Sequence, residues 1–244
     1  MEQTIHRGLD GVYIDTTKIC HIDGMKGELI YRGYDIRELA DKASFEEVTY
    51  LLWNGDLPDP AQLASFRDEL RSYTQLPPEI YELFRMFPED IHPMHAIRSA
   101  VSVLAAFDDH PDDVSLDNVR RIGTKLLVQL PALTAAFQRI RGGMEPVAPD
   151  PDLSIAGNFL HMLRNETPSD AATRVMDVAL VLHAEHGSNA SAFVARATAS
   201  TLTDVYSAIT AAIGSLKGPL HGGANMAVMG ALEDIGSVRG VEKY

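Results

Sequence analysis

A chain of 244 residues with 45% hydrophobic residues is long enough to form one large domain or two small ones around a buried core. Its formal net charge of −13 and the lack of a basic cluster argue against a nucleic-acid or anionic-membrane partner. The single cysteine, Cys20, excludes an intrachain disulfide, and the sequence shows neither a signal peptide nor an apolar run that could span a bilayer, so we expect a cytoplasmic protein.

The N-terminal segment carries a short β pattern. Residues 12–14, 18–22 and 28–31 are rich in strand-forming residues, and Asp23-Gly24 and Lys26-Gly27 supply turns between them. No later stretch repeats this pattern. The predicted fold class is therefore all-α, with a small N-terminal β-hairpin of two or three strands.

Helix signals follow in chain order. Ser44 and Glu47 form a capping box that predicts a helix through Trp53, and Asn54-Gly55 is expected to end it. Pro131 is expected to interrupt or kink a long helical pattern. The further predicted helices cover residues 60–73, 78–86, 94–107, 115–129, 133–141, 154–163, 169–186, 205–213 and 226–235.

Two polar segments lie between these helical patterns. Residues 108–113 contain four aspartates and one histidine, a composition more typical of a solvated turn than of a metal site. Residues 142–152 contain two glycines and three prolines and are predicted to form an exposed loop.

The stretch most suggestive of chemistry is Lys-Gly-Pro-Leu-His-Gly-Gly-Ala-Asn at residues 217–225. It places His221 between two helical patterns, among residues with little side-chain bulk. Backbone N–H groups there can approach a ligand, and the following helix would direct its positive end toward it. The alternative is a simple helix–turn–helix corner in which His221 hydrogen-bonds a backbone carbonyl, and the spacing alone favours neither.

A second polar stretch follows Leu182. His186 lies four residues further on, so it is predicted at a helix C-terminus on the core side, next to Gly187-Ser188-Asn189. His183 is expected to be a satisfied core histidine. The two histidines are spaced to share a metal ion, but a zinc site needs three or four ligands and no matching motif is present, so we predict no metal.

Other polar residues rank lower as site candidates. His92 and His95 flank Pro93 and are most simply part of a helix-start loop. Arg98 is a possible anion ligand, although an ion pair is the simpler expectation. No Gly-x-Gly-x-x-Gly or Walker-type loop occurs, so no nucleotide-phosphate site is predicted.

The two histidine segments, residues 183–191 and 218–225, resemble those of the citrate synthase family in their order and spacing. Residues 8–12 and 27–34 are similar to the shorter bacterial and archaeal type of that family, and the similarity covers essentially the whole chain. The resemblance implies a nearly all-helical fold with a large and a small domain and a homodimer. It also implies condensation of acetyl-CoA with oxaloacetate, a step of the tricarboxylic acid cycle, without a metal or other cofactor.

The resemblance also implies roles for individual residues. His221 would hydrogen-bond the thioester carbonyl oxygen of acetyl-CoA and stabilise the enol or enolate. A helix N-terminus suits that role, because its dipole favours a neutral imidazole and negative charge on the imidazole's partner. His186 would bind oxaloacetate with support from Asn189, and Leu220 and Gly222 would line the approach of the acyl-CoA.

The chain departs from the family pattern after Asn225. Family members carry a downstream Gly-x-Gly-His motif that polarises the oxaloacetate carbonyl, followed by the aspartate that removes the α-proton and by arginines that bind carboxylates; no such motif follows here. We therefore expect an N-terminal β segment at 1–34, a helical large domain at 35–235, and the start of a junction to a missing small domain at 236–244. Such a chain is expected to be inactive alone.

Two classes of function follow from these observations. One is an enzyme of this family, represented by its large domain, and the other is a non-catalytic dimerising module with a partial oxaloacetate pocket. Within the enzyme class, 2-methylcitrate synthase acting on propionyl-CoA is the alternative, since one methylene is worth only about 1–3 kcal/mol in a pocket. The sequence also predicts that His186 and His221 share a pocket, and that apolar positions in residues 175–182 and 205–213 form a dimer contact.

Overall fold

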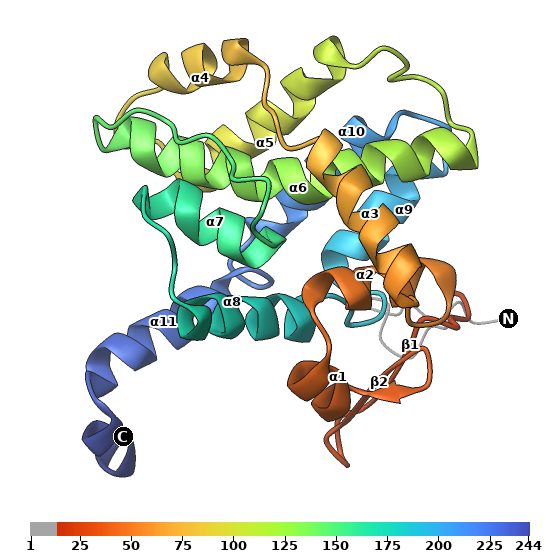
Figure 1. Ribbon diagram of the computed structural model, residues 1–244, viewed down its shortest axis with the longest axis vertical. Helices are drawn as coiled ribbons and strands as arrows, with labels where there is room; N and C mark the ends of the chain where they lie inside the picture. Colours follow the sequence, from red (N-terminus) through yellow and green to blue (C-terminus); the bar gives the residue numbers. More distant parts are fainter. Residues whose placement is uncertain (1–13) are drawn as a thin grey trace, which may run out of the picture.

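The computed structural model describes residues 14–244, apart from the side chains of Asn225 and Lys243, and contains eleven α-helices and one small sheet within that range (Figure 1). The predicted all-α class with a minor N-terminal β unit is confirmed. The helices are α1 (Ile36–Lys42), α2 (Phe45–Asn54), α3 (Pro60–Ser72), α4 (Pro78–Arg85), α5 (Pro93–Leu104), α6 (Leu116–Arg141), α7 (Ile155–Arg164), α8 (Asp170–His183), α9 (Ala190–Ala199), α10 (Val205–Leu216) and α11 (Gly223–Ile235).

The sheet has three antiparallel strands in the order β1 (Cys20–Asp23), β2 (Glu28–Tyr31) and β3 (Tyr34–Asp35). The predicted strands at 18–22 and 28–31 are confirmed in substance. Of the predicted strand at 12–14, residues 12 and 13 lie outside the described residues, and Ile14 is not in a strand. The third strand was not predicted, because it is only two residues long and depends on a turn in which Arg32 and Gly33 both have positive φ.

Local capping signals set several helix ends as predicted. Ser44 and Glu47 form the capping box of α2, and Gly55 ends that helix in the left-handed conformation at φ +101°. His92 is the N-cap of α5, where its Nδ1 accepts the Met94 N–H at 3.2 Å. α1 and α9 lie in stretches for which no helix boundaries are predicted.

Pro131 does not interrupt α6, which runs unbroken for 26 residues, so the prediction of two helices there is wrong. Proline removes one helical N–H donor, a local cost. Leu126 and Leu133, on either side of Pro131, are 3% and 0% exposed and belong to the same hydrophobic cluster. Tertiary packing on both sides of the proline therefore outweighs the missing hydrogen bond.

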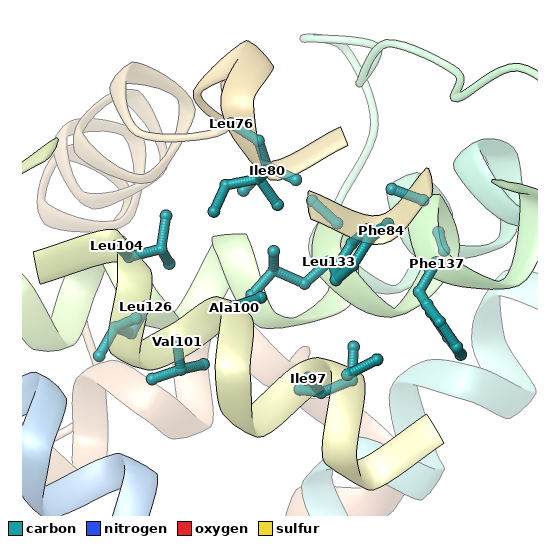
Figure 2. Close-up of a cluster of buried hydrophobic side chains, with 14 of the residues drawn as sticks. Leu76, Ile80, Phe84, Ile97, Ala100, Val101, Leu104, Leu126, Leu133 and Phe137 are labelled. Carbon is teal, nitrogen blue, oxygen red and sulfur yellow. The ribbon is translucent and has the colours of Figure 1, made fainter. Parts of the chain in front are cut away.

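The apolar side chains form two core clusters. The first joins α4, α5 and α6, and Figure 2 shows their side chains gathered together, among them Ile80, Val101 and Leu133. The second joins the sheet to α1, α2 and α8, with Tyr31 and Val181 both fully buried. Tyr31 and Ile36, which lie on either side of the expected boundary at residue 34, share this second cluster. The division into three segments stays a prediction.

The segment 108–113 is not wholly a solvated turn, as its composition suggests. The side chain of Asp108 is fully buried and binds Arg121 Nη2 at 2.5 Å, Lys125 Nζ at 3.0 Å and the Tyr206 hydroxyl at 2.7 Å. Burial alone would raise the pKa of Asp108, but hydrogen bonds from Arg121, Tyr206 and Lys125 outweigh burial and hold it far below 3.8. The prediction is wrong for Asp108, because partners far along the chain compensate its burial.

The described residues contain no helix that combines the length and the apolar character needed to cross a membrane. The longest helix, α6, spans 26 residues but carries charged side chains along its length, among them Arg120, Arg121 and Lys125.

Candidate active site

The first histidine segment is a loop that follows α8, so the predicted helix through His186 is wrong. α8 ends at His183. The reason lies in Tyr31, whose hydroxyl donates to the Val181 carbonyl at 3.3 Å and accepts the Glu185 N–H at 3.2 Å. Those two backbone groups would otherwise form the next helical hydrogen bond. A tyrosine from the N-terminal sheet thus stops the helix and opens the loop.

Both histidines of this segment are exposed, which corrects the expectation that they face the core. His183 Nδ1 lies 2.7 Å from the Ala179 carbonyl, and His186 Nε2 lies 3.2 Å from the Leu182 carbonyl. The loop therefore presents His186 to solvent, with Nδ1 as the ring nitrogen directed away from that backbone contact.

The N-terminal sheet also holds this loop in place through Cys20 of β1. Cys20 Sγ donates to Glu185 Oε1 at 3.2 Å, and the Gly187 N–H donates to the same oxygen at 2.5 Å. Gly187 has φ +68°, a conformation that glycine adopts without strain. Burial, together with the neighbouring Glu185, raises the pKa of Cys20 to about 11, so the thiol stays protonated as a donor at neutral pH.

Asn189 ends the loop and begins α9. Its side-chain oxygen accepts the Ala192 N–H at 3.0 Å, the usual N-cap contact. The residue was expected to support substrate binding, and the structure adds a structural role. Because the oxygen caps α9, the carboxamide nitrogen is the group that can donate to a ligand.

The second histidine segment is a tight turn between α10 and α11. The His221 and Gly222 N–H groups both donate to the Gly218 carbonyl at 3.0 Å. A Cβ on Gly222 would lie 2.0 Å from the Leu216 carbonyl oxygen, so the turn requires glycine there. Leu220 is fully exposed at the tip of the turn, and His221 is half-buried next to the N-terminus of α11.

Ser191 joins the two segments. Its Oγ lies 2.7 Å from His221 Nε2 and 3.1 Å from the Ala212 carbonyl of α10. α9 packs along α10, and this places the first turn of α9 against the turn that holds His221. The sequence predicts no role for Ser191, because nothing in the local pattern shows that residues 30 positions apart come into contact.

The Ser191 hydroxyl carries one proton and so constrains the imidazole. If it donates to Ala212, His221 Nε2 must carry a hydrogen and donate to Oγ. If it donates to Nε2, the neutral ring carries its hydrogen on Nδ1. In both cases Nε2 is occupied by Ser191, and Nδ1 is the nitrogen left to meet a ligand.

Cationic side chains lie near the C-terminal end of α10, which leads into this turn. Arg98 Nη2 donates to His95 Nδ1 at 3.2 Å, and Arg98 packs against α10 at Gly214. Burial, followed by the charges of Lys217 and Arg98, lowers the pKa of His95. No carboxylate among the described residues pairs with Arg98, so the expected ion pair is not observed. The turn therefore lies in a locally positive environment within an acidic chain.

A partly enclosed cavity lies elsewhere in the fold. It has a volume of about 220 Å³ and its lining includes neither His186 nor His221. Their joint pocket stays a prediction.

The chain matches the family model described as "Citrate synthase, C-terminal domain" over residues 8–244. It is 44% identical over 240 residues to citrate synthase of Deinococcus radiodurans, covering 98% of this chain and 64% of that protein. It is 42% identical over 232 residues to 2-methylcitrate synthase of Mycobacterium tuberculosis, covering 95% of this chain and 58% of that protein.

A solved structure agrees with these relatives. The ternary complex of citrate synthase from Thermoplasma acidophilum with carboxymethyl coenzyme A and oxaloacetate superposes with a TM-score of 0.89 at 31% identity, over 99% of this chain and 64% of that one. The chain thus spans slightly less than two thirds of the length of the proteins it matches. The sequence match, the fold and the contact between the two histidine segments agree, and the chain belongs to the citrate synthase family.

Proposed function

We propose that this chain provides the acyl-CoA and oxaloacetate contacts of an enzyme that condenses acetyl-CoA with oxaloacetate to citrate and CoA. The observation that carries the proposal is the 2.7 Å contact between Ser191 Oγ and His221 Nε2, which holds the second histidine segment against the first. Support comes from the Thermoplasma acidophilum relative, which was solved with both carboxymethyl coenzyme A and oxaloacetate.

His221 is proposed to stabilise the enol or enolate of acetyl-CoA. The role requires the tautomer in which Nε2 accepts the Ser191 hydroxyl proton, because the neutral ring then donates from Nδ1 to the thioester oxygen. The N-terminus of α11 adds the positive end of its dipole, which disfavours the imidazolium and favours negative charge on that oxygen. A donor placed in this way acts where charge develops during the reaction.

The remaining contacts divide between the two substrates. His186 on its exposed loop and the Asn189 carboxamide are proposed to bind oxaloacetate. Arg98 and Lys217 place positive charge around the His221 turn, which suits the phosphates of coenzyme A. Leu220 at the tip of the turn offers an apolar contact to the acyl chain.

The reaction also needs a base at the α-carbon and a group that polarises the oxaloacetate carbonyl. The family resemblance places both downstream of the second histidine segment, and no Gly-x-Gly-His follows Asn225. We therefore assign the condensation to the complete active site of the family and expect these 244 residues alone to be inactive.

Thiol release from acetyl-CoA, with and without oxaloacetate, tests this assignment. One sample is the 244-residue chain, and the other is the chain joined to the C-terminal part of the Deinococcus radiodurans relative. We expect oxaloacetate-dependent release only from the joined protein. Release by the chain alone at the rate of a complete enzyme would refute the division of roles, and a folded joined protein without release would refute the function.

Propionyl-CoA is the second candidate acyl substrate. The identities to the citrate synthase and the 2-methylcitrate synthase, 44% and 42%, are too similar to separate the two activities. Comparing kcat/KM for the two thioesters in the joined protein decides between them. A larger value for propionyl-CoA would replace citrate by 2-methylcitrate as the product.

Ser191→Ala tests the positioning of the imidazole. Because Ser191 occupies Nε2, its loss should lower kcat of the joined protein by about tenfold, equivalent to one neutral hydrogen bond, with little change in KM for oxaloacetate. The matched control is Ser200→Ala near the other end of α9, whose hydroxyl contacts only the Ala197 carbonyl. An unchanged kcat in Ser191→Ala, with normal stability, would show that the contact does not orient His221.

Self-association is also proposed. α11 carries four exposed apolar side chains, Met226, Val228, Met229 and Leu232, each more than half exposed, and it runs away from the other helices at the lower left of Figure 1. Val175 and Leu182 of α8 are exposed as well, whereas Val205 and Ile209 pack against the first core cluster. Apolar surface of this kind favours a self-complementary two-fold contact.

Sedimentation equilibrium at micromolar concentration should therefore show a dimer. Met229→Lys together with Leu232→Lys should shift the protein toward monomer, because it places charge on the apolar face of α11. Leu116→Lys is the matched control, since Leu116 is exposed at the start of α6, on another part of the chain. A wild-type monomer under these conditions would rule out the association.

A further inference from the structure

The cavity of about 220 Å³ lies between α2, α3, α6 and the loop that leads into α7. Its apolar wall includes Leu70, Val128, Pro131, Ala132, Leu153 and Met162. Pockets for drug-sized molecules enclose about 300–1,000 Å³, so this cavity suits a smaller ligand with an aliphatic body.

Glu46 of α2 provides a polar anchor in this cavity. The residue is 2% exposed, and its Oε1 accepts the Ile155 N–H at the start of α7 at 2.8 Å. Its Oε2 has no hydrogen-bond partner among the described residues. An unpaired buried carboxylate oxygen costs free energy, because it has lost its water without gaining a donor. A ligand with a cationic N–H group would supply that donor.

The positive charge in the cavity lining comes from α3, whereas Glu46 comes from α2. Arg67 and Arg71 lie one turn apart on α3, and both line the cavity. Arg71 pairs at 2.8 Å with Asp68, whose side chain is 73% exposed, and such surface pairs contribute little and exchange readily. Asp152, on the loop before α7, adds a second negative group. The lining therefore carries two cations from α3 and two anions from α2 and the loop.

The loop that carries Asp152 is held in place. Asn158 donates from Nδ2 to the Asp150 carbonyl at 2.7 Å and accepts the Asp150 N–H on Oδ1 at 2.7 Å. Such a loop loses little conformational freedom when a ligand binds, so less affinity is lost to ordering.

We propose that this cavity binds a small zwitterion of the chemistry of a free aliphatic amino acid. The ammonium group meets Glu46 and Asp152, the carboxylate meets Arg67 and Arg71, and the aliphatic body lies against the apolar wall. Balanced charges on separate walls favour a ligand with both signs over a simple anion or cation. The site is separate from His186 and His221, and the proposal does not depend on the condensation reaction.

Calorimetric titration and thermal shift of the protein test the proposal with three matched compounds. They are leucine, 4-methylpentanoate, which lacks the ammonium group, and 3-methylbutylamine, which lacks the carboxylate. We expect saturable leucine binding with a rise in Tm, and binding about tenfold or more weaker for each analogue, because a hydrogen bond to a charged group is lost. The absence of leucine binding at millimolar concentration, or equal binding of an analogue, would overturn the proposal and leave water as the partner of Glu46.

Three variants locate the binding. Glu46→Gln keeps an oxygen for the Ile155 N–H but loses the charge, and Arg67→Gln with Arg71→Gln removes the positive wall. Both changes should weaken leucine binding about tenfold or more. Arg85→Gln, an exposed arginine of α4 that pairs with Glu82, is the control and should bind as wild type. Should Glu46→Gln fail to fold, the α3 variant decides alone, and unchanged binding in it refutes the site.

Discussion

Replacing His221 by alanine should lower oxaloacetate-dependent thiol release from acetyl-CoA about 10²–10³-fold, the usual cost of removing one preorganised donor from a developing oxyanion. The reason is geometric: Ser191 lies at Nε2, so Nδ1 is the nitrogen proposed to meet the thioester oxygen, and it donates when Nε2 accepts the Ser191 hydroxyl proton. The assay uses the chain joined to the C-terminal part of its Deinococcus radiodurans relative, because the groups proposed to act with His221 are expected downstream of the second histidine segment.

The loss should fall on kcat and leave the fold intact. His221 is half-buried and, among the described residues, its ring has one hydrogen bond, to Ser191, so Tm should change little. The KM for oxaloacetate should also stay close to its original value, since oxaloacetate binding is assigned to His186. His161→Ala, a half-buried histidine of α7 whose Nδ1 contacts the Glu166 carbonyl, is the matched control. A loss below about tenfold, with a folded protein, would assign the oxyanion donor to another group.

Much of the fold follows from signals that act within a few residues. The capping box of Ser44 and Glu47 and the left-handed Gly55 set both ends of α2 as predicted. Such signals are readable because both partners lie on the same turn of chain. The class, all-α with a small sheet, follows from the helical periodicity of the rest of the chain.

Three of the errors have long-range causes. Tyr31 ends α8 from 150 positions away, packing around Leu126 and Leu133 carries α6 through Pro131, and Arg121 and Tyr206 bury Asp108. A local sequence pattern does not reveal these contacts, because the contacts depend on which elements pack together. Tertiary contacts override local propensity in each case.

In the candidate site too, local motifs identify some residues and long-range contacts reveal the others. The motifs identify His186 and His221, and the family resemblance supplies their expected roles. The structure adds the Ser191 contact, the exposure of the His186 loop, and the way Cys20 holds that loop through Glu185. These supporting residues lie on other elements, so only the packed chain reveals them.

Removing the Asp108 carboxylate should be among the most destabilising single changes in the chain. Asp108→Ala leaves Arg121 and Lys125 without their buried partner and the buried Tyr206 hydroxyl without its acceptor. Breaking a buried pair in this way typically costs about 3–5 kcal/mol in the free energy of unfolding. Urea denaturation measures the change, and Asp112→Ala, an exposed residue of the same loop, should stay within about 0.5 kcal/mol of wild type.

The dependence on pH gives a second and sharper test. Because the pKa of Asp108 is far below 3.8 in the folded protein, its ionised form stabilises the fold above about pH 4. That contribution is lost as the pH falls below 3.8 toward the folded-state pKa, since the unfolded chain then takes up the proton first. The difference in unfolding free energy between wild type and Asp108→Ala should therefore shrink from pH 5 toward pH 2. A difference that is constant over this range would mean that packing of the side chain, and not its charge, secures the loop.

The same variant should also affect the site. Tyr206 lies in the first turn of α10, and the Ala212 carbonyl near the other end of that helix contacts Ser191, which holds His221. If Asp108 secures α10 as its contacts indicate, Asp108→Ala should lower kcat of the joined protein even at temperatures where it remains folded. Full activity in a folded but destabilised Asp108→Ala would show that α10 keeps its place through apolar packing alone.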